Sequence, residues 1–153
     1  MLVVSIEKTS ERHLDKLVKT AIFRERIRVL KNISFAEMYN YLSASDIGVV
    51  PWPEKYYTSL PVKVFDYLAA GLPVIIKGPK QGALREFYKK NPFIGKYIFS
   101  WKAFLNTFND MVKNLSRTKN NFDKRVSIIK TKWNRKKGAR KAFRTICSLI
   151  NSS

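Results

Sequence analysis

The stretch from Asn32 to Ile75, NISFAEMYNYLSASDIGVVPWPEKYYTSLPVKVFDYLAAGLPVI, decides the fold class. It holds a short apolar run rich in β-branched residues at 47–50 and ends within a second such run at 73–76. Between them a helical pattern begins near Pro61 and ends at Gly71, where proline suits the first helical turn and glycine suits the residue after the last. Strand, helix and strand in this order are typical of a parallel sheet. We therefore expect an α/β fold.

The same alternation extends outward from this stretch. Apolar residues recur at helical spacing at 14–21 and at 35–42. The second of these helices opens with a capping box, in which Ser34 and Glu37 can satisfy each other's free backbone amides. Further apolar runs that predict strands lie at 2–6, 27–30 and 97–99.

A chain of 153 residues fits one domain. We expect a single Rossmann-like domain over residues 1–153, whose core at 2–100 is a parallel sheet flanked by helices. From 101 to 150 aromatic and aliphatic residues recur at helical spacing, with a polar break, SRTKNN, at 116–121. This last part predicts extra C-terminal helices.

The charge is uneven along the chain. The formal net charge is +19, and residues 101–153 carry 14 basic and 2 acidic side chains. A field of one sign favours anionic partners, namely nucleic acid, acidic lipid headgroups or phosphorylated ligands. A solvated lysine-rich surface without a partner explains the same composition.

Several classes of protein are excluded or disfavoured by composition. Cys147 is the only cysteine and His13 the only histidine, which excludes a disulfide framework and Cys/His zinc sites and disfavours a histidine-based triad. No apolar run approaches the ~18 residues of a membrane span, and the apolar start is too short for a secretory signal. We therefore expect a cytoplasmic protein.

A candidate anion site follows the strand at 47–50. In open parallel sheets, ligands bind beyond the carboxyl ends of strands, where loops lead into helix N-termini. The amides around Ser59 to Lys63, together with the positive end of the helix dipole, suit a phosphate. Ser59, Lys63 and Asp66 share one helix face, and a carboxylate one turn beyond the phosphate suits the two hydroxyls of a ribose.

The opposite face of this helix is expected to pack against the sheet through Val62, Phe65, Leu68 and Ala69. Lys63 and Asp66 also fit a surface ion pair, which is the commoner meaning of a three-residue spacing on its own. The nucleotide site and the surface pair are therefore both open at this point.

The segment 32–75 resembles the donor-binding half of GT-B glycosyltransferases, specifically the large retaining family called family four. The resemblance rests on residues that occur in the order of the family's Ser-x-Pro-x-Lys segment: Ser59, Pro61, Lys63, Asp66, Tyr67, Ala69, Gly71, Pro73 and Val74. It covers residues 2–90. It implies a fold in which a nucleoside diphosphate sugar lies between two Rossmann-like domains.

Carried onto this chain, the resemblance makes Ser59, Leu60 and Pro61 the phosphate-facing loop, with amide donors from Ser59 and Leu60. Lys63 would neighbour the phosphates, and Asp66 takes the place of the family's ribose-binding glutamate. The segment at 77–86, with Gly82, is similar to the family's next loop. No metal and no other cofactor is implied, and no residue is assigned to catalysis.

The chain departs from the family pattern at three points. Thr58 stands where the family has a first glutamate, and Asp66 is shorter than the second. The family's first unit, whose cations hold the diphosphate, and its acceptor-binding domain are both absent from residues 1–153. The resemblance therefore implies a donor-binding domain or subunit of a glycosyltransferase, which either works with an acceptor-domain partner chain or is a remnant or fragment of a larger enzyme.

Two other functions stay open. One is a non-catalytic module that binds a nucleotide sugar or a partner. The other is binding to an anionic membrane surface, at its periphery, or to nucleic acid, through the basic segment 124–144. No zinc finger spacing, RNP-type aromatic motif or helix-turn-helix supports nucleic acid, so we rank it below the membrane surface.

Overall fold

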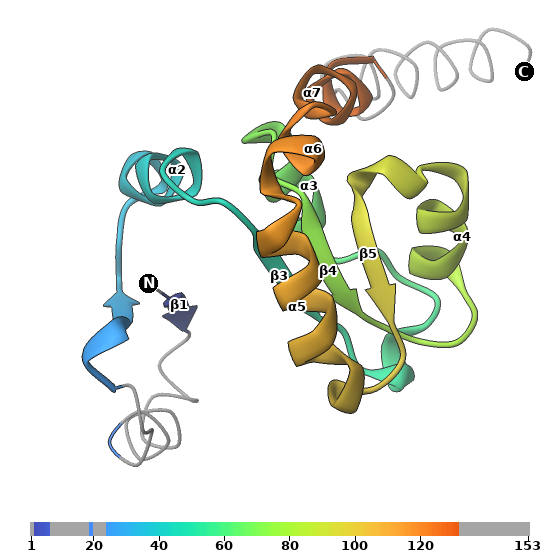
Figure 1. Cartoon of the computed structure of the whole chain (residues 1–153), viewed down its shortest axis with the longest axis horizontal. Coiled ribbons are helices and arrows are strands. Elements are labelled where there is room, and N and C mark those ends of the chain that lie inside the picture. The colour runs from blue at the N-terminus through green and yellow to red at the C-terminus, as the bar shows by residue number, and fades with distance from the viewer. Residues whose placement is uncertain (1, 7–18, 20–23, 132–153) are drawn as a thin grey trace, which may run out of the picture. The chain divides into compact units, whose positions relative to one another are not determined.

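The computed structural model describes residues 2–6, 19 and 24–131 (Figure 1). Residues 1–41 and 42–153 form two compact units. The prediction of a single domain over 1–153 stays a prediction. Apart from Lys19, the helix expected at 14–21 lies outside the described residues, as does the part of the basic segment beyond Thr131.

The first unit contains a parallel pair of strands, β1 (Leu2–Ile6) and β2 (Ile27–Lys31), whose register sets Leu2 beside Ile27. A short 3-10 turn, η2 (Arg24–Arg26), precedes β2. Both strands were predicted from their apolar runs. The start of α2 (Phe35–Ser43) has the expected capping box: the Ser34 amide donates to Glu37 Oε2 at 2.8 Å, and the Glu37 amide donates to Ser34 Oγ at 3.2 Å. The pKa of the Glu37 carboxyl is lowered, and the hydrogen bond from the Ser34 amide is the largest cause.

The second unit is built on a three-stranded parallel sheet in the order β3-β4-β5 (Figure 1). The strands are β3 (Gly48–Pro51), β4 (Val74–Lys77) and β5 (Gly95–Ile98), with Gly48 beside Val74 and Val74 beside Gly95. Helix α3 (Val62–Ala69) connects the first pair, and α4 (Ala83–Lys90) connects the second. The α/β class with a parallel sheet flanked by helices is confirmed.

Helices cover both faces of this sheet. Val74 and Ile76 of β4 pack in one core cluster with Val64 and Leu68 of α3 and with residues of α4. Ile75, which points to the other face, packs with Met111 of α5 (Phe104–Lys113). Successive strand residues point to opposite faces, and two right-handed crossovers in the same direction put their helices on the same face. Val74, Ile75 and Ile76 of β4 are therefore all apolar, because the strand is buried on both sides.

Four short elements complete the second unit. The 3-10 turns η3 (Glu54–Tyr56), η4 (Pro92–Ile94) and η5 (Trp101–Ala103) precede α3, β5 and α5. Residues Leu115–Lys119 form a short helix, α6, where the sequence predicted a polar break. Asn114 ends α5 by donating its side-chain amide to the Asp110 carbonyl. The chain then resumes helical turns, in which exposed polar residues such as Ser116 and Arg117 lower helix stability only slightly.

Helix α7 (Phe122–Thr131) is fastened by one buried cation. Arg125 is fully buried, and its Nε donates to the Gly71 carbonyl at 2.8 Å while its Nη1 donates to the Phe93 carbonyl at 3.4 Å. Burial lowers the pKa of this guanidinium. The arginine joins α7 to the end of α3 and to η4, two segments distant in sequence.

Among the described residues, no helix is long and apolar enough to cross a membrane.

Candidate functional site

The loop between β3 and α3 is folded around one carbonyl oxygen. The Tyr56 carbonyl accepts three hydrogen bonds, from Trp52 Nε1 at 3.0 Å and from the amide and hydroxyl of Ser59 at 3.1 Å each. The rings of Trp52 and Tyr56 lie 5.2 Å apart. A loop tied to itself in this way presents its outer atoms in a fixed arrangement, which lowers the entropic cost of binding a ligand.

The same bonds change the role expected of Ser59. Its amide was expected to donate to a phosphate, but both its amide and its hydroxyl already donate within the loop. The helix that follows supplies other donors. Pro61 is the N-cap of α3, with φ −69° and ψ 131°, so the first amides of the helix belong to Val62 and Lys63 and lack intrahelical partners. Pro61 therefore lies just before the first helical turn, whereas it was predicted to lie within it.

The predicted site residues differ in their exposure. Thr58, Ser59 and Lys63 are exposed, Leu60 and Asp66 are half-buried, and Pro61 is buried. Leu60 packs against the core and so anchors the end of the loop. Among the described residues Lys63 forms no ion pair, so the surface pair with Asp66 that the spacing also allowed is not formed. Lys63 therefore extends into solvent at the start of α3.

The side of α3 that packs on the sheet differs from the predicted side. Val62 was predicted to be buried, but its side chain is 59% exposed, whereas Val64 and Leu68 are fully buried. Pro61, Val64, Phe65 and Leu68 form the packed stripe, at the spacing of one helix face. Val62 lies one turn before Asp66, so it is on the side of Lys63 and Asp66 and not on the packed side. That side is open to solvent.

A second loop meets the first at Gly82. The Ala83 amide, at the start of α4, donates to the Tyr57 carbonyl at 2.8 Å. Gly82 has φ +98°, and a Cβ at this position would collide with that same carbonyl oxygen. Only glycine permits both the backbone conformation and the close approach. The loops that follow β3 and β4 are therefore in direct contact beyond the carboxyl ends of the two strands, and this contact brings Gly82 beside residues 57–61.

Tyr97 of β5 supports the loop that follows β4, and it was not predicted from the sequence. Its hydroxyl donates to the Pro79 carbonyl at 2.7 Å, and the Gly78 amide donates to the Ile98 carbonyl at 3.1 Å. Burial and, less strongly, the carboxylate of Glu54 raise the pKa of Tyr97 to about 12, although the Arg85 guanidinium opposes them. The aromatic residues at alternate positions, 97 and 99, were the feature of the sequence that could have indicated this role.

Arg85 completes this support by lying over three rings. Its guanidinium carbon is 4.9 Å from the ring centre of Tyr97, 5.0 Å from that of Phe99 and 5.6 Å from that of Tyr88. Such cation–π contacts contribute about 0.5–1 kcal/mol each where they are exposed. They fix α4, and with it Gly82, against β5.

Two other predictions about ligands stay predictions. Within the described residues no three His, Cys, Asp or Glu side chains gather in a group that could hold a metal ion. Of the basic segment 124–144, only the part up to Thr131, the end of α7, is described.

No family model, no curated protein and no solved structure matched this chain in the three comparisons.

Proposed function

We propose that this chain binds a nucleoside diphosphate sugar at the loops after β3 and β4 and acts as the donor-binding part of a glycosyltransferase. The observation that carries the proposal is the contact between Tyr57 and Ala83, because it joins the two loops on which the resemblance to family-four GT-B enzymes depends. Lys63 at the start of α3 adds an exposed cation beside helix amides.

In this proposal the diphosphate lies at the start of α3. The amides of Val62 and Lys63 donate to its oxygens, and the Lys63 ammonium offsets their charge. Asp66 lies one turn further along the same helix and accepts from the ribose hydroxyls. The same contacts favour transfer, since the nucleoside diphosphate gains negative charge as it leaves the sugar.

The acceptor side of the reaction needs a separate acceptor-binding domain. Holding the acceptor hydroxyl against the anomeric carbon can contribute about 7–11 kcal/mol to the step. None of the residues discussed above is assigned to that task. We therefore propose a partner chain that carries an acceptor-binding domain, and a chain that binds donor without turnover is the alternative.

Two substitutions separate the proposed roles of Lys63 and Asp66. Asp66→Ala should weaken a nucleoside monophosphate and the matching diphosphate alike, by about 10–100-fold, because a charge-assisted hydrogen bond contributes about 1.5–3 kcal/mol. Lys63→Ala should weaken the diphosphate more than the monophosphate. Calorimetric titration of each variant with both nucleotides measures the two effects.

Lys102→Ala is the matched control, because Lys102 is also exposed but belongs to η5. It removes the same charge from a +19 chain and should leave both affinities unchanged. If Lys63→Ala and Asp66→Ala bind both nucleotides like the parent, the assigned site is wrong. Sugar transfer upon adding an acceptor-domain partner would favour the enzyme over the non-catalytic module.

A further inference from the structure

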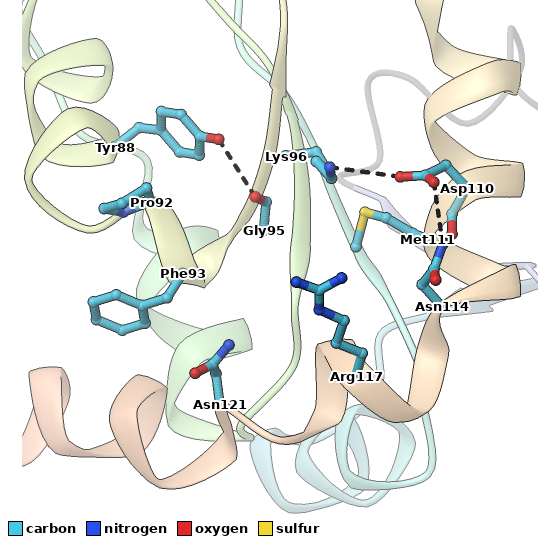
Figure 2. A pocket seen from close by; sticks show the side chains of 10 residues that line it. All are labelled: Tyr88, Pro92, Phe93, Gly95, Lys96, Asp110, Met111, Asn114, Arg117 and Asn121. Atoms are coloured by element: carbon cyan, nitrogen blue, oxygen red, sulfur yellow. Dashed lines mark hydrogen bonds and ion pairs between the residues drawn. The ribbon is translucent and has the colours of Figure 1, made fainter.

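A cavity lies at the end of the three-stranded sheet that is opposite to the proposed donor loops. Its volume is about 440 Å³, and it opens beside Gly95, the first residue of β5, between η4, α5 and α6 (Figure 2). The donor loops follow the carboxyl ends of β3 and β4, whereas this cavity is at the amino end of β5. A ligand here would therefore not compete with the nucleotide.

The one carboxylate in this cavity is already engaged. Asp110 Oδ2 lies 3.5 Å from Lys96 Nζ, and Asp110 Oδ1 accepts from the side-chain amide of Asn114 at 3.1 Å. Figure 2 shows this chain of contacts along the α5 side of the cavity. The lysine offsets the charge of the aspartate, so the cavity does not repel an anion.

Two polar side chains face the cavity without a partner among the described residues. Figure 2 shows the Arg117 guanidinium and the Asn121 amide pointing into the space between η4 and α5. Within the described residues neither side chain makes a hydrogen bond or an ion pair. A guanidinium matches a carboxylate or a phosphate with two parallel hydrogen bonds, and an amide can add a third donor.

The wall opposite the arginine is apolar. Phe93 and Tyr88 border the cavity, and the Tyr88 hydroxyl donates to the Gly95 carbonyl at 3.4 Å. Met111, which is buried, forms part of the floor. The volume exceeds what a bare phosphate or carboxylate would fill, and the remaining space borders aromatic rings.

We propose that this cavity binds a small organic oxyanion, that is, a carboxylate or phosphate ester whose apolar group packs on Phe93 and Tyr88. Arg117 holds the oxyanion, with Asn121 as a further donor, while the Lys96–Asp110 pair keeps the rim polar and close to neutral. The chemistry is independent of the donor site, so the two proposals stand or fall separately.

Phenyl phosphate and benzoate are the probes for the two oxyanions, and benzylamine is the cationic analogue of the same size. Amide chemical shifts of the full chain, titrated with each probe at ~150 mM salt, should move saturably at Gly95 and Asn121 for at least one of the anions and not for benzylamine. Arg117→Gln should weaken that binding at least about tenfold, which corresponds to the loss of one charged contact.

Lys113→Gln is the matched control, because Lys113 is an exposed cation at the end of α5 that does not line the cavity. It should bind the anion like the parent, and Asn121→Ala should weaken the same anion less than Arg117→Gln does. The proposal is overturned if neither anion binds saturably, if benzylamine binds equally well, or if Lys113→Gln lowers affinity as much as Arg117→Gln. Shifts confined to Lys63 and Gly82 would also overturn it.

Discussion

Gly82 is the residue at which the two halves of the proposed donor site meet. Its backbone lies in a region that L side chains rarely adopt, and the Tyr57 carbonyl occupies the space of a Cβ. Gly82→Ala should therefore lower the free energy of unfolding by about 1–3 kcal/mol from backbone strain alone, and separate the loops as well. Urea unfolding measures the first effect, and the amide exchange rate of Ala83 measures the second.

Gln81→Ala is the control for Gly82→Ala, since Gln81 is the exposed neighbour in the same loop. It should change the free energy of unfolding by no more than about 0.5 kcal/mol. An Ala83 amide that remains as protected in Gly82→Ala as in the parent would show that the Tyr57 contact does not hold the loops together.

Tyr97 makes the stability of the second unit depend on alkaline pH. Burial, the largest cause, and the carboxylate of Glu54 raise its pKa from 10.0 to about 12, against the opposing charge of Arg85. The unfolded chain loses this proton at lower pH than the folded chain, so the contribution is complete below pH ~10 and is lost as the pH rises toward ~12. The free energy of unfolding should fall across that window.

Urea unfolding at several pH values between ~8 and ~11.5 tests this dependence, with Tyr97→Phe as the variant. The variant should be less stable at neutral pH by about 1 kcal/mol, because it lacks the hydrogen bond to Pro79, and its stability should fall less steeply above pH ~10. Tyr57→Phe, at an exposed position, should keep the slope of the parent. An unchanged slope in Tyr97→Phe would contradict the assignment.

At the scale of single residues, the sequence predicted which positions gather but not which atoms are available. Gly82 lies beside the 57–61 loop, but the Ser59 donors are used by the Tyr56 carbonyl. A turn that consumes a serine amide and hydroxyl depends on the local path of the backbone, and composition does not encode that path in a readable way. Tyr97 and Arg85 were missed because their contacts join segments far apart in sequence.

At the scale of elements, strands were easier to predict than the orientation of helices. All five described strands fall within one or two residues of their apolar runs. The clearest case is β4, whose first three residues are continuously apolar because the strand is buried on both faces. The packed side of α3 was predicted with Val62 in place of Val64, since an eight-residue helix contains too few turns to fix its phase from the pattern alone.

Leu68 and Val62 provide a direct test of the packed side of α3. Leu68→Ala should lower the free energy of unfolding by about 2–5 kcal/mol, because it leaves a cavity in the core shared with β4. Val62→Ala should change it by no more than about 0.5 kcal/mol, since that side chain is mostly exposed. Equal losses in urea unfolding would contradict the packing described for this helix.

At the scale of the whole molecule, charge and fold contribute different information. The parallel sheet with helices on both faces follows from periodicity alone and was predicted. The division into units at residues 41 and 42 was not, because apolar runs show where strands are and not which of them pair. The net charge of +19 attracts anions in general, so any measurement of nucleotide binding has to separate a specific site from this background.

The most direct test of the proposed function is a calorimetric titration of the full chain with UDP, GDP and ADP, and with their sugar conjugates, at ~150 mM salt, where general attraction to the surface is largely screened. We predict that the nucleotides of one base bind saturably, with one site per chain, and that this binding is lost in Asp66→Ala. Equal weak binding of all the nucleotides, unaffected by Asp66→Ala, would contradict a donor site at α3.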